Sequence, residues 1–180
     1  SGPEAITKVN QVFKGRNLEK VSTHTAHYGP IRDGEATLDE GVATVFRAPR
    51  SYTGENVVEL SCHGSPYVLR NVMEVLLRLG IRHADAGEFT LRAFLNGKMD
   101  LSQAEGVADL IASESATSRD AAINQLRGGF SEKIKELRER LLNFSSLLEL
   151  ELDFSEEDVE FANREALQHT LDEIYQTVKN

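Results

Sequence analysis

The sequence lacks the features that would tie the chain to a membrane or to an oxidising compartment. It contains one cysteine, Cys62, so an internal disulfide cannot form, which fits a reducing cytoplasm. No apolar stretch is long enough to cross a bilayer, and neither a signal peptide nor an initiator methionine is present. We therefore expect a cytoplasmic location, no membrane partner, and a natural N-terminus that lies before Ser1.

The sequence also lacks a nucleotide-binding loop. No G-x-x-x-x-G-K-[ST] run occurs, because Gly97-Lys98 is followed by Met99 rather than by Ser or Thr. The net charge of −9 argues against a nucleic-acid-binding surface, which normally carries a basic patch. We predict that this chain alone neither binds nor hydrolyses GTP.

Two weak signals of chemistry surround His63. Cys62 and His63 are adjacent, which offers too few ligands at the wrong spacing for a metal. The nearby Ser61 and Ser65 do not form the G-x-S-x-G turn that carries a hydrolase nucleophile. We therefore expect no metal site and no hydrolase triad.

What is present is an ordinary globular composition, with enough apolar residues for one or two domains. Residues 5–13 place apolar side chains on one helical face. Residues 24–31 and 41–47 have strand patterns on either side of the turn signal Asp33-Gly34, so we predict an antiparallel pair. Residues 57–62 form a third apolar run of strand length.

A helix is predicted directly after this third strand. Ser65 can cap it through its hydroxyl, Pro66 suits its first position, and Gly80 ends it. Residues 81–84 then have the pattern of a short strand. The first half is therefore α+β, with a small mixed or antiparallel sheet and packed helices.

After about residue 90 every pattern is helical, which predicts an all-α bundle segment. Asp100 and Gln103 are predicted to form a capping pair. Apolar residues then recur at helical spacing, and Gly128-Gly129 interrupts them, so either the helix breaks there or another backbone packs close. The segment 155–158 has the pattern of a new helix start, and a last helix is expected from about Arg164.

The most informative run extends from Gly87 to Glu105, where charged and amide side chains lie among Phe and Leu residues. It resembles the G-E-F-[ST]-x-R-A-F-L-N-x-K-x-D-L-x-Q-A-E signature of the tRNA modification GTPases called MnmE or TrmE. Further segments resemble that family in the same order: Ser1-Gly2-Pro3, Ser51 to Leu60, Cys62 to Pro66, Ala108 to Ile111, and Leu152 to Glu157. Small departures occur at Ala86, Cys62 and Asn56, where the family usually has Pro, Gly and Asp.

The resemblance implies a domain organisation. Residues 1–95 would be a tetrahydrofolate-binding and dimerisation domain that lacks its first strand, and residues 96–180 would be the first half of a helical domain. The parent protein would be a GTPase that modifies carbon 5 of the wobble uridine of tRNA, with a flavoprotein partner of the MnmG or GidA type. GTP, magnesium and potassium would belong to a GTPase domain outside this chain.

The resemblance also implies a cofactor, a reduced folate such as 5-formyl- or methylene-tetrahydrofolate. The family's Glu at the position of Glu59 contacts the pterin, whose ring N–H and amine suit a carboxylate. The family's Lys at the position of Lys98 contacts the folate through a formyl or ring oxygen or through the glutamate tail. Period-two alternation alone would simply point Glu59 to solvent, and most Lys residues at such a place solvate a loop.

Three further residues, Arg92, Asn96 and Glu88, are possible supporting residues of the site. Glu88 and Arg92 are four apart, so a structural ion pair on a helix explains them better than a ligand role. A rival interpretation of the whole chain is a non-catalytic helical scaffold or dimerisation module without a ligand. The long apolar stripe in the second half would suit that role.

Overall fold

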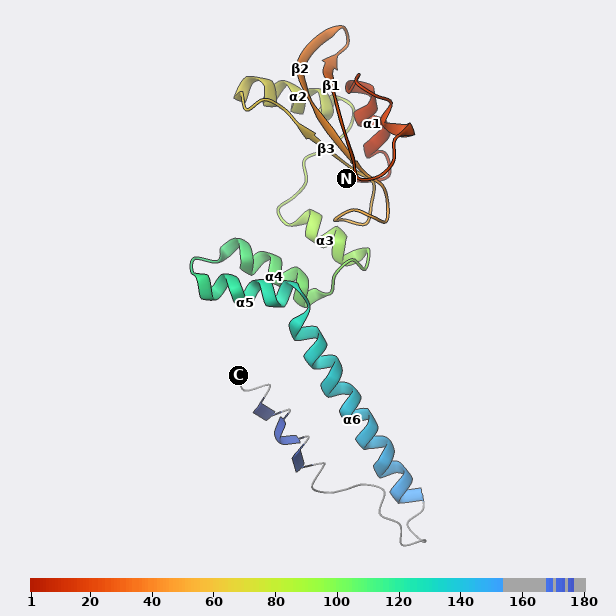
Figure 1. Cartoon of the computed structure of the whole chain (residues 1–180), viewed down its shortest axis with the longest axis vertical. Helices are drawn as coiled ribbons and strands as arrows, with labels where there is room; N and C mark the ends of the chain where they lie inside the picture. The colour runs from red at the N-terminus through yellow and green to blue at the C-terminus, as the bar shows by residue number, and fades with distance from the viewer. Residues whose placement is uncertain (154–167, 170, 174, 177–180) are drawn as a thin grey trace. The chain divides into compact units, whose positions relative to one another are not determined.

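The computed structural model describes residues 1–153, 168–169, 171–173 and 175–176 (Figure 1). The chain forms two compact units, Ser1–Ala104 and Glu105–Asn180. The helix start expected at 155–158 lies outside the described residues. Of the helix expected from about Arg164, the structure describes residues 168–169, 171–173 and 175–176, and these are helical.

The first unit contains a three-stranded antiparallel sheet in the order β1-β2-β3. Its strands are β1 (Thr25–Asp33), β2 (Ala36–Phe46) and β3 (Val57–Ser61). The turn between β1 and β2 contains Gly34 at a φ of 58°, a conformation that glycine adopts without a steric cost. All three strands and this turn confirm the predictions from the sequence.

Two helices, α1 (Ala5–Val12) and α2 (Pro66–Arg78), pack on one face of this sheet. A short 3-10 helix, η1 (Leu18–Lys20), follows α1. Their apolar faces meet alternate residues of β1 and β2 in a core from which water is excluded. Its buried members are Ile6, Val9, Phe13, Leu18, Val21, Ile31, Ala43, Val45 and Val72.

Two local predictions in this unit are wrong. Residues 81–84 form no strand, because no described strand lies beside them to supply backbone partners. Ser65 does occupy the position before α2, with Pro66 at the helix start, but its hydroxyl makes no capping hydrogen bond. Its carbonyl instead accepts the first bond of the helix, from the amide of Leu69 at 3.0 Å.

Two more helices follow, α3 (Glu88–Leu95) and α4 (Leu101–Ala112). The capping pair predicted before α4 is present. The amide of Asp100 donates to Gln103 Oε1 at 3.0 Å, and the amide of Gln103 donates to Asp100 Oδ1 at 2.9 Å. This reciprocal pair satisfies two amides that the helix itself leaves without acceptors.

The second unit continues with α5 (Ala116–Leu126) and α6 (Gly129–Asp153). The long helix is therefore interrupted at Gly128. Its φ of 83° is a left-handed conformation that residues with a side chain rarely adopt. A close backbone approach occurs elsewhere, at Gly106 of α4: a Cβ there would lie 2.8 Å from the amide nitrogen of Leu126. The α+β first part and the helical second part confirm the predicted fold class.

Candidate functional site

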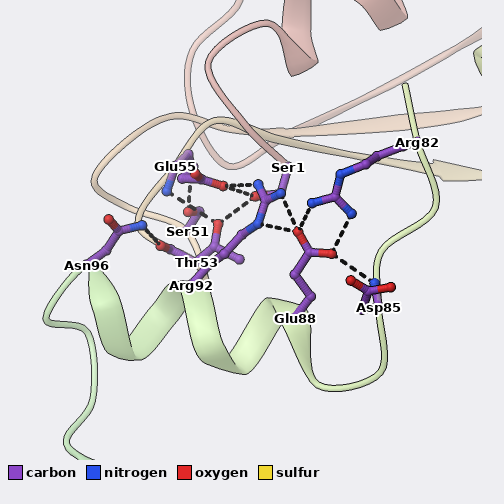
Figure 2. A network of polar contacts seen from close by, with 9 residues as sticks. All are labelled: Ser1, Ser51, Thr53, Glu55, Arg82, Asp85, Glu88, Arg92 and Asn96. Atoms are coloured by element: carbon purple, nitrogen blue, oxygen red, sulfur yellow. Dashed lines mark hydrogen bonds and ion pairs between the residues drawn. The ribbon is translucent and has the colours of Figure 1, made fainter. Parts of the chain in front are cut away.

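The polar face of α3 carries a network of charged side chains around Glu88 (Figure 2). Arg82 approaches Glu88 with two guanidinium nitrogens, and the Asp85 amide donates to the same carboxylate at 2.8 Å. From the next turn of the helix, Arg92 donates to Glu88 Oε1 at 2.5 Å and 3.0 Å. Arg82, the Asp85 amide and Arg92 together hold the pKa of the Glu88 carboxyl well below its ordinary value.

Arg92 links this helix to a loop that lies far away in the sequence. Its Nη1 donates to Glu55 Oε2 at 3.0 Å, so one guanidinium contacts two carboxylates. Burial alone would raise the pKa of Glu55, but hydrogen bonds from Ser1 and Arg92 outweigh burial, and the pKa lies below its ordinary value. The predicted pair of Glu88 and Arg92 is therefore one part of a larger structural network.

The loop between β2 and β3, residues 47–56, has its own internal order. Ser51 Oγ donates to the Glu55 carbonyl at 2.6 Å. Thr53 is fully buried, and its hydroxyl lies 2.7 Å from Ser1 Oγ and 3.3 Å from the Glu55 amide. Figure 2 shows Ser51, Thr53 and Glu55 gathered above α3. A buried hydroxyl with these partners fixes the loop conformation.

Residues that follow α3 hold the same loop from a second side. Asn96 Nδ2 donates to the Thr53 carbonyl at 2.7 Å, as Figure 2 shows. Lys98 Nζ donates to the Pro49 carbonyl at 3.2 Å. The predicted supporting residues Arg92, Asn96 and Glu88 and the predicted ligand residue Lys98 thus all belong to one region around this loop.

Glu59 lies elsewhere, on β3, opposite Thr44 of β2. Thr44 alternates with the buried residues Ala43 and Val45, so the face that carries Thr44 and Glu59 points away from α1 and α2. Glu59 is exposed, and its carboxylate has no hydrogen-bond or ion-pair partner among residues 1–153. No described contact joins Glu59 to Lys98, although the loop that Lys98 contacts leads directly into β3.

A groove of about 780 Å³ lies beside β3 in the first unit. Within the described residues no strand pairs with the outer edge of β3, although the Gly2 amide donates to the Asn56 carbonyl at 2.9 Å just before this strand begins. Part of the wall of this groove is polar and is formed by Arg82, Glu88 and Arg92. Its apolar lining comes from α1, β3, α2 and the segment after α2: Val9, Val58, Leu60, Val72, Leu76 and Ile81.

The neighbourhood of His63 has a structural explanation. His63 Nδ1 lies 2.7 Å from Asp39 Oδ1, and the His63 amide donates to the same carboxylate at 2.8 Å. These bonds hold the pKa of Asp39 below its ordinary value, while burial raises the pKa of the Cys62 thiol. In the part of the chain that the structure describes, no three His, Cys, Asp or Glu residues gather as metal ligands.

Sequence reasoning did not single out Ser51, Thr53, Glu55 and Arg82 as site residues. Each acts through a contact with a residue that is distant in the sequence or that lies across a loop, so no local periodicity marks it. The available signal was the run from Ser51 to Glu55, which places three polar side chains around Gly54. A fully buried threonine beside a glycine with a φ of 77° is a property of the folded loop.

Two family models match the chain in succession. Residues 1–98 match the N-terminus of the GTP-binding protein TrmE, and residues 101–180 match the MnmE helical domain. The chain belongs to the MnmE family. Similar proteins named tRNA modification GTPase MnmE include those of Christiangramia forsetii, 59% identical over 99% of this chain, Cytophaga hutchinsonii, 54% identical over 99%, and Flavobacterium johnsoniae, 58% identical over 97%.

The chain spans only 38–39% of the length of these MnmE relatives. The GTPase activity in their name is therefore that of proteins more than twice as long. Among the described helices of this chain, none has the length and apolar character that a membrane span requires.

Proposed function

We propose that this chain is the N-terminal part of a tRNA modification GTPase. The observation that carries the proposal is the succession of the TrmE N-terminal and MnmE helical matches along the chain. In this proposal the parent protein modifies carbon 5 of the wobble uridine with a flavoprotein partner of the MnmG or GidA type. GTP, magnesium and potassium act in a GTPase domain outside this chain, and the complete protein works in the cytoplasm.

The proposed task of the first unit, which contains the predicted domain of residues 1–95, is to bind a reduced folate. The exposed carboxylate of Glu59 supports this, because it has no competing partner among the described residues. Its two oxygens suit a pterin, which offers a ring N–H and an exocyclic amine side by side. Charge-assisted hydrogen bonds of this kind are roughly twice as strong as neutral ones. The folate supplies the one-carbon chemistry, and these residues bind and orient it.

Lys98 is the second proposed folate residue. Its ammonium has three donors, and the Pro49 carbonyl takes one of them at the long distance of 3.2 Å. The remaining donors suit a formyl or ring oxygen, or the carboxylates of a glutamate tail. Lys98 contacts the loop that leads into β3, which supports a site shared with Glu59 at this end of the sheet.

The first strand that the family resemblance implies has a natural place beside β3. The outer edge of β3 is unpaired within the described residues, the groove beside it has apolar walls, and Gly2 already bonds to Asn56 at one end. A strand there would satisfy the edge amides and carbonyls and would offer partners to residues 81–84. We expect the β3 amides to exchange more slowly with deuterated water once this strand is restored.

Calorimetric titration with 5-formyl-tetrahydrofolate tests the folate proposal, in this chain and in a version with the first strand restored. Glu59→Gln replaces one acceptor oxygen with a donor that faces the pterin donor, at a cost of about 1–3 kcal/mol, so affinity should fall by at least about tenfold. Glu35→Gln, in the exposed β1–β2 turn, is the matched control and should bind as the parent does. Equal affinity for Glu59→Gln and the parent would remove Glu59 from the site.

Two further tests address the rest of the proposal. Saturable GTP binding by this chain alone would contradict it, because the sequence has no phosphate-binding loop. We also propose a homodimer formed through the α+β unit. Light scattering of the version with its first strand restored should give twice the monomer mass, and a monomer at high concentration would contradict the dimer.

The rival function is a helical scaffold or dimerisation module without a ligand. The exposed apolar residues of α6, including Phe130, Ile134 and Leu142, favour it because they offer an interaction surface. The same folate titration separates the two functions. Saturable binding that depends on Glu59 supports the folate site, and no binding by the restored version supports the scaffold.

A further inference from the structure

The stem of Lys98 packs against one particular point of the 47–56 loop. A Cβ built on Gly54 would lie 3.3 Å from Lys98 Cγ, 3.5 Å from Lys98 Cδ and 3.2 Å from Asn96 Cβ. Gly54 also has a φ of 77°, a left-handed conformation that residues with a side chain rarely adopt. The absence of a side chain at this position therefore leaves the space through which the lysine stem runs.

Asn96 fixes the loop at the neighbouring residue. Its amide donates to the Thr53 carbonyl at 2.7 Å, one peptide before Gly54. On the other side of the loop, Arg92 bonds to Glu55 at 3.0 Å. Figure 2 shows these two hydrogen bonds, from Arg92 of α3 and from Asn96 directly after it, which hold the residues on either side of Gly54.

This arrangement restricts a side chain that is normally free. Lysine has a flexible four-carbon stem, and ordering it on binding reduces the affinity that its ammonium can provide. Here the stem packs on Gly54 and the ammonium bonds to the Pro49 carbonyl at 3.2 Å, although Lys98 is exposed as a whole. The ordering cost is then met by the fold before a ligand arrives.

We propose that Gly54 and Asn96 are positioning residues that hold the ammonium of Lys98 in place for an anionic or carbonyl-bearing ligand. The statement that this ligand is a reduced folate rests on the function proposed above. Neither residue needs to touch the ligand. Gly54 acts by leaving room for the stem, and Asn96 acts by anchoring the loop against which the stem packs.

The chain supplies a matched control for backbone strain. Gly34, in the β1–β2 turn, has a φ of 58°, and a Cβ there would meet nothing within 4 Å. Gly34→Ala therefore introduces a comparable strain without a clash at Lys98. Asn96→Asp keeps the size of the side chain but removes the donor, so it tests the loop anchor without filling space.

The first measurement needs no ligand. Lysines are labelled by reductive methylation with 13C, and the Lys98 signal is identified as the one that Lys98→Arg removes. We expect Gly54→Ala and Asn96→Asp to move this signal toward those of freely exposed lysines and Gly34→Ala to leave it in place. An unchanged signal in both Gly54→Ala and Asn96→Asp, or an equal change in Gly34→Ala, would overturn the inference.

The second measurement is calorimetric titration of the same variants with 5-formyl-tetrahydrofolate, in the version with its first strand restored. Gly54→Ala and Asn96→Asp should each lose about tenfold in affinity, the size expected for one charge-assisted hydrogen bond, and Gly34→Ala should lose none. Full affinity in both variants would overturn the inference. If the parent itself binds no folate, the folate proposal fails, and the Lys98 signal alone decides whether Gly54 and Asn96 position that side chain.

Discussion

The two units of this chain bury their apolar residues to different extents. In the first unit, Phe13, Leu18, Ile31 and Val45 are almost completely buried between the sheet and two helices. In the second unit, Ala122 and Phe144 are the only buried apolar residues that the structure describes, while Phe130 on α6 remains 55% exposed. Both units have helices with apolar faces, so the helical pattern alone does not decide how much of that face is buried.

The difference follows from the kind of contact that each unit makes. A sheet brings together residues that are far apart in the sequence, and helices packed on it enclose a core from two sides. The described helices of the second unit lie close to their neighbours along the chain, as the approach of Gly106 to Leu126 shows. We therefore expect a stable first unit and a second unit whose stability depends on a few close contacts.

The largest expected effect concerns the core of the first unit. Phe13→Ala should lower its free energy of unfolding by about 3–5 kcal/mol, because a fully buried ring leaves a cavity. Phe130→Ala on α6 should cost less than about 1 kcal/mol, since this ring is already half exposed. Urea unfolding, monitored in each unit by hydrogen exchange of its peptides, measures the loss of stability in both variants. Similar losses would contradict the contrast between the units.

The second prediction concerns the close approach of α4 and α5. Gly106→Ala places a Cβ 2.8 Å from the Leu126 amide nitrogen and 3.2 Å from the Ala122 carbonyl oxygen. Overpacking of about 1–3 kcal/mol should exceed the gain in helix propensity of about 1 kcal/mol. Gly129→Ala is the control, because the three atoms nearest to its Cβ all belong to the movable side chain of Asn124. A thermal melt in which Gly106→Ala is the more stable variant would refute the close approach.

A third, smaller effect tests the start of α5. The Ser115 hydroxyl accepts from the Ser118 amide at 3.1 Å, and the Ser118 hydroxyl accepts from the Ser115 amide at 3.1 Å. Ser115→Ala should cost about 1 kcal/mol, the usual value of a helix cap. Ser65→Ala, at the start of α2, should cost clearly less, because that hydroxyl makes no capping bond. Thermal unfolding of both variants checks the order.

The smallest expected effect is the pH dependence of the network on α3. The pKa of Glu88 is lowered in the folded chain, so its stabilisation is complete above the ordinary glutamate value of about 4.3 and declines as the pH falls below it. The difference in unfolding free energy between the parent and Glu88→Gln should therefore be constant at neutral pH and shrink in acid. Glu74→Gln on α2 is the control, and an equal acid response would show that Glu88 has no special role.

The candidate site was only partly predictable, for a physical reason. Lys98, Asn96 and Arg92 belong to one continuous run, so the resemblance of that run to a family motif indicated them together. Their partners Thr53 and Glu55 lie about forty residues away, and only a folded loop brings these partners to α3. The placement of Glu59 relative to Lys98 likewise depends on side-chain geometry rather than on spacing.

The sequence by itself determined the strands around Gly34, the pair of Asp100 and Gln103, and the family, because each depends on residues within a few positions or on a long ordered motif. Only the tertiary structure decided that the helical stripe breaks at Gly128, that residues 81–84 form no strand, and that Gly54 leaves room for the Lys98 stem. Residues 81–84 would need a neighbouring strand to bond their backbone groups. The space at Gly54 matters only because a second segment, which carries Lys98, packs into it. Neither the neighbour nor the second segment is encoded in the local pattern.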